Sequence, residues 1–504
     1  MPASPFAPLR RTVPCPSISR RPNQALGRPA RQRNENVISR QFDCQPRTLY
    51  SSFATRQNDR AHPRPAIQPS VETQLHKTPL ALAILFAARS VAAQTPGPSS
   101  FELSGVFDIG IGYSQHSLSQ DANYPIGMSP VATRLGDHSN TGMFNGGLAP
   151  SRLTFKDTED MGSGLKAFMT LETGFNPFSG VISNGVLSLV NNPAKKQATV
   201  SADSSLAGQL FNREANVGIS SSEWGSVSIG RNYSFGYDTL AAFDPMEASS
   251  TFSPFGYSGS YGGGGSTEDY RVDNSIKYKI QSNGVKAGLL YKFGAQGGLT
   301  GAQSEIQGSL GYENARFAIQ GTYSSIKDGI FSTNSNTTGA LDISVANTVA
   351  YMLAASYKTD LWRLRGGYER IRFANPSNPA LDATTTNVFG YPVGAINLAP
   401  YPADKHFDLY FTGLSYNLLP QFRATVAGYL VKQNNFSIGA CITGVNVASC
   451  SGTNQFYSML GDYSLSKRTH LYAGYMYNRV HGGFSSGFLH DANNFAGGGI
   501  KHSF

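Results

Sequence analysis

The segment Phe101-Glu-Leu-Ser-Gly-Val-Phe-Asp-Ile-Gly-Ile-Gly-Tyr113 decides the fold class of this chain of 504 residues. Large apolar and aromatic residues hold nearly all of its odd-numbered positions, and the even-numbered positions are mostly small or polar. Successive side chains of a β-strand point to opposite faces. The segment therefore predicts a strand with one apolar face and one polar face.

Segments with this alternation recur as far as Phe504, and a turn follows each of them. A long series of alternating strands is typical of a β-barrel in an outer membrane. The fold class we predict is all-β, a 16-stranded antiparallel transmembrane β-barrel. Its strands are expected near 101–113, 151–157, 164–174, 211–220, 225–233, 270–281, 284–294, 304–313, 315–325, 346–358, 361–373, 405–418, 421–432, 455–465, 468–480 and 494–504.

The connections between the predicted strands alternate between short and long. Short ones such as Glu223-Trp224 and Thr359-Asp360 follow one strand, and long ones such as 175–210 and 234–269 follow the next. In an antiparallel barrel this alternation puts the short turns on one rim, which in outer-membrane barrels is the periplasmic one. Closure also removes strand edges, whose unpaired backbone groups lipid cannot hydrate.

Charged residues obey the same alternation. Lys286 and Lys292 oppose the apolar positions of 284–294, and Arg363 and Arg365 oppose apolar neighbours in the same way. A Lys or Arg that faced lipid at mid-bilayer would cost ~2–4 kcal/mol. We therefore expect these charges to line a lumen, which in a barrel of sixteen strands is an aqueous channel.

The formal net charge of +9 belongs to the N-terminal segment. Residues 1–93 contain 14 of the 41 Lys and Arg residues but only 4 of the 32 Asp and Glu residues. The remaining chain is almost neutral, so the basic balance gives no reason to expect a nucleic-acid partner. No apolar run reaches the ~18 residues that a spanning helix needs.

Three regions are expected along the chain. Residues 1–70 are rich in Arg, Pro and Ser without periodicity, which predicts a disordered extension. Residues 71–93 contain a short polar start, an apolar core and Val91-Ala-Ala93, the pattern of a signal peptide; the alternative is a short buried helix. Because signal peptides normally begin a chain, we expect translation to start near Val71 and the barrel to occupy 94–504.

The chain from 99 onward resembles the trimeric general porins of Gram-negative bacteria, particularly the β-proteobacterial type. Four pieces carry this resemblance in the family's order. They are Ser151-Arg-Leu-Thr-Phe-Lys-Asp-Thr-Glu-Asp-Met-Gly-Ser-Gly-Leu165, Phe211-Asn-Arg-Glu-Ala-Asn-Val-Gly-Ile219, Gly230-Arg-Asn-Tyr-Ser-Phe-Gly-Tyr-Asp-Thr-Leu240 and the ending Gly499-Ile-Lys-His-Ser-Phe504. The terminal Phe504 is similar to the signal read by the outer-membrane assembly machinery.

The resemblance implies that the third long loop folds into the barrel and narrows it. Here that loop is 234–269, and it would set acidic residues against arginines of the wall. Asp244 and Glu247 are the loop acids so implied. The wall positions fall on three arginines: Arg152, Arg213 and Arg271.

Each assignment has a structural alternative. Any of the arginines could be a wall charge without a role in the constriction, and Asp244 could be a loop cap. Glu247 lies one residue out of phase with the family's second acid. Arg213 shares its parity with Val217, so an inward orientation of Arg213 requires a bulge or small apolar residues facing the lumen.

Cys441 and Cys450 lie in the long connection 433–454. An even pair of cysteines in an exported protein predicts a disulfide bond. A pair of free thiols is the alternative.

The sequence shows little that would support catalysis. The histidines after residue 93 have no metal-ligand spacing, and Gly262-Gly-Gly-Gly265 is not followed by the Lys of a phosphate loop. A hydrolase dyad of His470 with Ser458 or Ser464 is conceivable, because these residues fall on neighbouring strands. We expect no enzyme activity, no cofactor and no metal.

The function predicted is an outer-membrane channel for passive diffusion of ions and small hydrophilic solutes. The resemblance implies a homotrimer embedded in outer-membrane lipid. A preference for anions is favoured by the arginines. The alternatives are a substrate-selective porin and a non-conducting surface barrel that acts as a receptor or adhesin.

Overall fold

The computed structural model of the protein describes most of the predicted barrel. The residues described are 99–117, 138–177, 180, 210–256, 270–294, 301–328, 331–333, 342–344, 347–377, 387–388, 391–392, 403–437, 441, 449–485 and 490–504. The predicted extension 1–70 and signal peptide 71–93 lie outside them, so both stay predictions.

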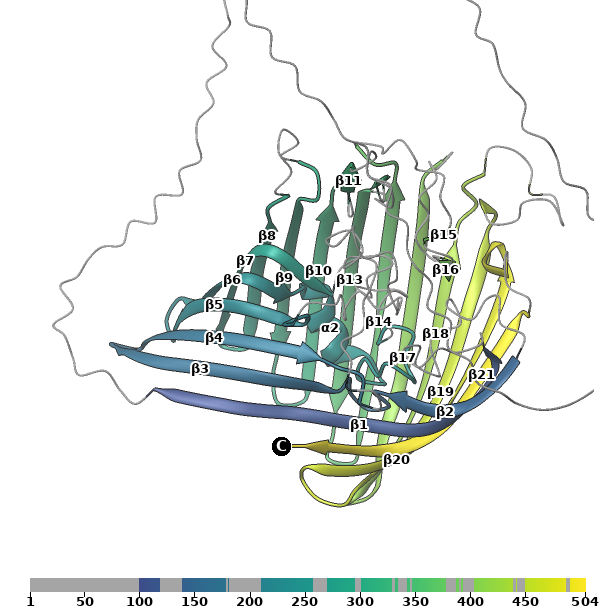
Figure 1. Ribbon diagram of the computed structural model, residues 1–504, viewed down its shortest axis with the longest axis horizontal. Helices are drawn as coiled ribbons and strands as arrows, with labels where there is room; N and C mark the ends of the chain where they lie inside the picture. The colour runs from purple at the N-terminus through teal and green to yellow at the C-terminus, as the bar shows by residue number, and fades with distance from the viewer. Residues whose placement is uncertain are drawn as a thin grey trace, which may run out of the picture. The chain divides into compact units, whose positions relative to one another are not determined.

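One antiparallel sheet closes on itself to form the barrel (Figure 1). Its first strand, β1 (Ser100–Ser117), pairs with its last, β21 (Ala492–Ser503). The backbones of Gly105 and Phe504 extend this seam by exchanging hydrogen bonds of 3.0 and 3.1 Å. The predicted fold class, a closed 16-stranded antiparallel β-barrel, is confirmed.

The remaining strands of the main sheet follow one another around the wall, and short helices and hairpins lie in the connections between them. In chain order they are β2 (His138–Asn145), β3 (Arg152–Gly162), β4 (Leu165–Gly174), β5 (Glu214–Ser221), β6 (Gly225–Tyr233), α2 (Phe235–Phe243), β7 (Arg271–Ser282), β8 (Val285–Lys292), β9 (Glu305–Glu313), β10 (Phe317–Ile326), β11 (Phe331–Thr333), β12 (Asp342–Ser344), β13 (Asn347–Lys358), β14 (Trp362–Ala374), β15 (Asn387–Val388), β16 (Tyr391–Pro392), β17 (Lys405–Leu419), β18 (Phe422–Gln433), β19 (Gly452–Ser464), β20 (Thr469–Gly482) and η3 (Gly483–Ser485). Two small hairpins, β11–β12 and β15–β16, lie outside the main sheet.

The main sheet has seventeen strands although the barrel has sixteen strand positions, because β2 and β3 together occupy one position next to β1. β2 pairs with the C-terminal half of β1, and β3 pairs with its N-terminal half. The partner of Asn145 is Ile109 and the partner of Arg152 is Val106. The step from Asn145 to Arg152 is thus four positions longer than the step between their partners on β1, so four extra residues leave the ladder between β2 and β3. Sequence reasoning missed β2, because its Ser-Asn-Thr-Gly content does not alternate clearly.

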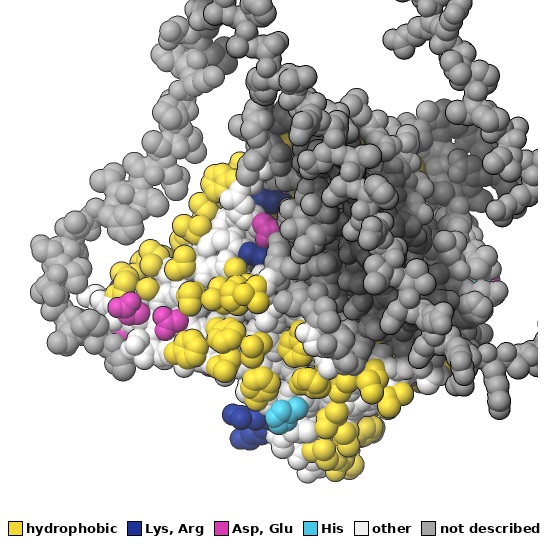
Figure 2. All heavy atoms as spheres, in the orientation of Figure 1, with side chains coloured by type: hydrophobic (Ala, Val, Ile, Leu, Met, Phe, Trp, Pro, Cys, Tyr) yellow, Lys and Arg dark blue, Asp and Glu magenta, His cyan; other side chains and the backbone are white. Residues whose placement is uncertain are grey.

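The two faces of the wall differ as the alternation predicted. On β8 the side chains of Val285, Leu289 and Tyr291 are exposed on the outside, and Leu289 is 63% exposed. Lys292 has the opposite parity and is buried. Figure 2 shows hydrophobic side chains gathered on the outer surface of the first strands. Lipid solvates such side chains, so their exposure is the expected state of a membrane barrel.

Short turns join β3–β4, β5–β6, β7–β8, β9–β10, β13–β14, β17–β18 and β19–β20. We call the barrel end that carries them the short-turn rim. Long connections join the remaining neighbours at the other end, as predicted. Within the described ranges, no helix has the length and apolar character needed to cross a membrane.

The predicted disulfide bond is present in the long connection between β18 and β19. The sulfur atoms of Cys441 and Cys450 are 2.08 Å apart, and their Cα atoms are 5.8 Å apart. The bond ties the start of β19 to its own loop at the end of the barrel opposite the short turns.

We expect Leu289→Lys and Ser309→Lys to differ sharply in stability. Leu289 and Ser309 lie at the same depth on neighbouring strands, because their partners in the ladder are Gly308 and Gly288. Leu289 faces lipid, so its replacement should lower the free energy of unfolding by ~2–4 kcal/mol. Ser309 faces the lumen, where a Lys stays hydrated. Urea titration of the refolded protein in lipid vesicles measures both, and equal losses would contradict the assignment of the faces.

Candidate functional site

The helix α2 begins the long connection between β6 and β7. Ser234 caps it by accepting a hydrogen bond of 3.0 Å from the backbone N–H of Tyr237. Asp238 lies in the first turn, where a negative charge is favoured by the helix dipole. Phe235, Leu240 and Phe243 form the buried face of the helix. The local sequence thus specifies a short amphipathic helix just after a strand.

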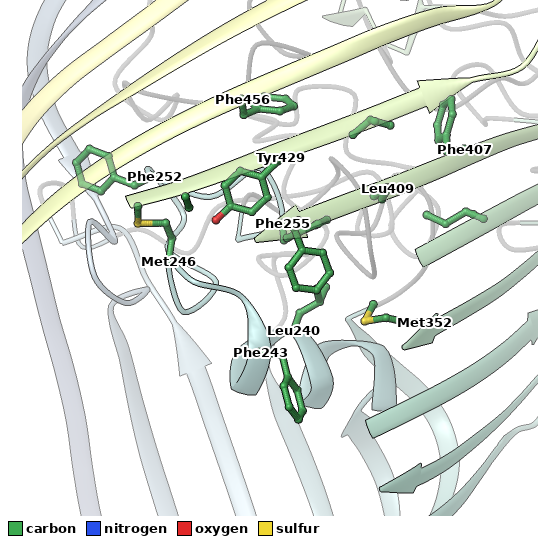
Figure 3. Close-up of a cluster of buried hydrophobic side chains, with 14 of the residues drawn as sticks. Leu240, Phe243, Met246, Phe252, Phe255, Met352, Phe407, Leu409, Tyr429 and Phe456 are labelled. Atoms are coloured by element: carbon green, nitrogen blue, oxygen red, sulfur yellow. The ribbon is translucent and has the colours of Figure 1, made fainter. Parts of the chain in front are cut away.

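The helix and the segment after it pack on the inner face of the wall. Figure 3 shows Leu240 and Phe243 of α2, with Met246, Phe252 and Phe255, near Met352, Leu409, Tyr429 and Phe456 of the strands. These wall residues have the opposite parity to exposed neighbours such as Leu353, Tyr410 and Tyr457. Residues 235–256, which we call the inner segment, therefore occupy the inside of the barrel. The rest of the loop, 257–269, is not described.

Asp244 joins this segment to the wall. It is fully buried, and its carboxylate accepts hydrogen bonds from the backbone N–H groups of Met246 (3.3 Å) and Ala248 (2.8 Å). The hydroxyl of Tyr429 on β18 donates to it at 2.6 Å. Burial raises the pKa of the Asp244 carboxyl, although the hydrogen bonds from Tyr429 and the backbone oppose this rise. Asp244 thus has no exposed surface, and its role in a constriction stays a prediction.

The break between β2 and β3 holds the far end of the same segment. Residues 146–151 leave the ladder there, and three of their N–H groups (Gly147, Leu148 and Ala149) donate to the carboxylate of Asp108 at 2.8–3.2 Å. The Ser249 hydroxyl donates to the carbonyl oxygen of Gly147 at 2.6 Å, and Ser250 donates to the carbonyl of Gly146. Residues 146–151, which we call the shelf, thus bind Ser249 and Ser250 of the inner segment.

Arg152 and Arg213, two of the predicted wall arginines, lie against the same carboxylate. The Nε atom of Arg213 is 2.6 Å from Glu172 Oε1, and the Nε atom of Arg152 is 3.4 Å from Glu172 Oε2. Arg213 is only 2% exposed. It precedes the first residue of β5, so the parity of that strand does not govern it. Glu172 was not predicted, although it follows the inward parity of its strand.

Arg271 starts β7 and is enclosed by aromatic rings. Its guanidinium carbon lies 5.0–5.6 Å from the ring centres of Tyr233, Tyr237 and Tyr270. Such contacts are favourable cation–π interactions when they are desolvated. Arg271 is 95% buried. Like Arg213, Arg271 therefore has little exposed surface that a solute could contact.

Among the described acids of the loop, Glu247 has the most exposed side chain. Its side chain is 41% exposed, and it contacts Arg365 on β14 at 2.9 Å and Arg423 on β18 at 3.3 Å. Burial alone would raise the pKa of the Glu247 carboxyl, but Arg423 and Arg365 together lower it below its usual range. Arg423 also contacts Asp462 on β19 at 3.2 Å. An acid of the loop thus contacts arginines of the wall, but these arginines, Arg365 and Arg423, were not among the three predicted for the constriction.

A cavity of ≈ 550 Å³ with a mixed polar and apolar lining lies beside α2, along β5–β10. Asp238 of the helix borders it, and so do Lys279 and Lys286 of the wall. Ser220, Ser226 and Ser309 add hydroxyl groups to its lining. Most apolar side chains of residues 235–256 thus pack on β13–β20, Phe235 packs on Val272 and Leu290, and a water-accessible space remains along β5–β10.

A profile of the Gram-negative porin family matches residues 80–483. The chain belongs to this family. An outer membrane porin protein of Bordetella pertussis is 27% identical over 449 residues, which are 85% of this chain and the whole of that relative. Outer membrane porin protein 32 of Delftia acidovorans is 26% identical over 48% of this chain and 57% of its own length.

Solved porin structures share the fold. The anion-selective porin from Comamonas acidovorans superposes with a TM-score of 0.55 at 19% identity, over 81% of this chain and all of that one. The trimer form of OmpT from Vibrio cholerae gives a TM-score of 0.50 at 13% identity, over 81% and 100% of the two chains. This porin therefore resides in the outer membrane and provides a channel for passive diffusion.

The conceivable hydrolase dyad of this porin lacks the required arrangement. The Ser464 hydroxyl lies 3.3 Å from Nδ1 of His470, and Asp462 lies 2.9 Å from that same nitrogen. A Ser-His-Asp relay uses both ring nitrogens, one for each partner. Ser458 instead donates to the backbone carbonyl of Phe252 at 2.7 Å and so holds the inner segment. Among the described residues, no group of three or more His, Cys, Asp or Glu side chains is arranged to hold a metal ion.

We expect Glu247→Gln to increase the preference of the channel for chloride, because it removes the acid between Arg365 and Arg423. The pKa of Glu247 is lowered, so its charge is fully present above the usual value of 4.5 and is lost only as pH falls through the lowered value. The difference from wild type should therefore persist from pH 7 to pH 5. Reversal potentials in a KCl gradient measure it.

The control for this comparison is Glu223→Gln, which removes the same charge from an exposed turn of the short-turn rim. Its reversal potential should be close to that of the wild type. Identical reversal potentials for the wild type and Glu247→Gln at pH 7 would contradict the placement of Glu247 beside the permeation path.

Proposed function

We propose that ions and small hydrophilic solutes pass between α2 and the wall β5–β10, with a preference for anions. The observation that carries this proposal is the one-sided packing of residues 235–256. Apart from Phe235, which packs on Val272 and Leu290, their apolar side chains fill the space against β13–β20, whereas the cavity of ≈ 550 Å³ lies beside Asp238. A hydrated solute needs a polar path, because stripping its water without compensation is costly.

We assign the constriction of this path to two charged groups of the inner segment. Asp238 faces Lys277 of β7 at 2.7 Å beside the cavity. Glu247 faces Arg365 of β14 and Arg423 of β18, so it adds a second charged group on the opposite side of the lumen. Acids opposed to bases across a pore create a transverse field, and rings of charge set ion selectivity. Arg152, Arg213 and Arg271 act at a distance in this scheme, because the first two contact Glu172 and tyrosines enclose the third.

Single-channel recording in planar bilayers tests the channel. We expect stepwise conductance that rises in proportion to salt concentration, with a reversal potential that indicates chloride preference. Saturation of the current by one solute at low concentration would favour the alternative of a substrate-selective porin. The absence of stepwise conductance from folded protein would contradict the proposal and favour a non-conducting receptor or adhesin.

We further propose that the protein assembles as a homotrimer in outer-membrane lipid and that the assembly machinery recognises Phe504. The trimer form of OmpT supports the first part, and the exposure of the Phe504 side chain supports the second. Native mass spectrometry in detergent should show three chains per particle. Phe504→Ala should lower the amount of folded barrel in the membrane, whereas Phe317→Ala, at another exposed strand end, should not. A monomer, or equal loss in both variants, would contradict the respective part.

A further inference from the structure

Five basic side chains cluster beneath α2 at the short-turn rim. Four of them, Lys286, Arg316, Lys358 and Arg363, line a space of ≈ 80 Å³ with Glu313. Lys279 and Lys286 line the larger cavity of ≈ 550 Å³. The two spaces share Ala242 of α2, Lys286 and Gln320 as lining residues, so they adjoin. We call the group of Lys279, Lys286, Arg316, Lys358 and Arg363 the rim cluster.

Two acids near the rim cluster, Asp238 and Glu313, are already paired. Asp238 forms its ion pair with Lys277, and Glu313 pairs with Lys286. Lys279, Arg316 and Lys358 are exposed and form no ion pair with a carboxylate of the described residues. Arg363 donates from Nη2 to the carbonyl oxygen of Ala242 at 3.2 Å. Its buried Nε atom has no hydrogen-bond partner in the described part of the chain. The rim cluster therefore retains an excess of positive charge.

Three of these cations are held next to one another by the backbone. Lys358 and Arg363 are direct partners in the ladder between β13 and β14, and both face inward. The N–H of Lys358 donates to the carbonyl of Arg316 at 2.8 Å. Like charges that lie directly opposite each other on a sheet are destabilising. These three cations lie side by side at a cavity whose one lining acid, Glu313, is paired with Lys286, so a bound anion would relieve their repulsion.

Neutral donors complete the lining. The amide nitrogen of Gln320 donates to Thr239 of α2 at 2.7 Å and to Ser309 at 3.1 Å, which fixes its position between the two spaces. Asn314 accepts hydrogen bonds from the N–H groups of Arg316 and Phe317 and so shapes the turn that presents Arg316. A guanidinium group binds the oxygens of phosphate or carboxylate in a forked geometry, and ammonium groups bind them as point charges.

We propose that the rim cluster is a low-affinity binding site for small polyvalent oxyanions, phosphates or carboxylates, that enter or leave the channel at its short-turn end. This inference rests on the proposed channel function and names its substrate class. The site is separate from the Glu247 constriction, where the arginines already contact acids. Its exposed cations attract anions without holding them tightly, because solvent screens each contact.

The test uses inorganic pyrophosphate, and citrate in a parallel arm, as blockers of the chloride current through single channels. Each is added to one side of the bilayer at a time. The wild type should be blocked at lower concentration from the short-turn side than from the long-loop side. In the double variant Arg316→Gln with Lys358→Gln, the half-blocking concentration from the short-turn side should rise about five- to tenfold, from two solvent-screened contacts.

The matched control is Lys467→Gln with Arg468→Gln. These two exposed cations lie on the same rim, in the turn between β19 and β20, and line neither space. Their removal changes the net charge equally and should leave the half-blocking concentration close to that of the wild type. If both double variants weaken the block equally, only the overall charge of the rim matters, and the proposed site is wrong.

Further outcomes separate the two levels of the proposal. A wild type that conducts but is not blocked by either anion overturns the rim site and leaves the channel function intact. A wild type without conductance overturns the channel function itself. Should the double variant fail to fold, Lys358→Gln alone removes one cation from the end of a strand, and an unchanged block in it would also count against the site. Block by pyrophosphate but not citrate, or the reverse, decides between phosphates and carboxylates.

Discussion

The structure depends on the need to pair every backbone N–H and C=O group that crosses the membrane. Lipid offers these groups no hydrogen bonds, so an open sheet edge would be costly. The pairing of β1 with β21, extended by Gly105 and Phe504, removes that edge. Closure then divides the side chains into an outer set that lipid solvates and an inner set that must find partners or water. All other features of the molecule lie within that inner set.

The inward-facing side chains differ in their packing on the two sides of the lumen. Along β13–β20 they are largely apolar and pack against residues 235–256, which Asp244 and the shelf at 146–151 hold in place. Along β5–β10 they face open space, apart from Val272 and Leu290, which pack against Phe235. Charge follows this division. The arginines near Glu172 and Glu247 contact those acids, whereas Arg316 and Lys358 form no ion pair with a carboxylate of the described residues. Selectivity in such a channel therefore depends on which cations lack acids and not on how many cations there are.

Much of this could be predicted from alternation because it is a local property. The inward orientation of Lys286, Arg363 and Arg365 follows from strand parity alone, and the structure shows it. The break between β2 and β3 could not be predicted, since nothing in residues 146–151 reveals that their N–H groups will surround Asp108. The same holds for Glu247, whose partners are more than a hundred residues away in the chain.

The sequence by itself determined that the chain forms a closed antiparallel barrel, which side chains face lipid and which face the lumen, and which rim carries the short turns. These properties need only the period of two and the lengths of the connections. Tertiary structure decided which charges meet. Asp244 has the sequence of a loop acid, but Tyr429 and two backbone N–H groups bury it, whereas Glu247, three residues later, remains open to water. Burial and pairing depend on distances across the barrel, and no local pattern encodes those distances.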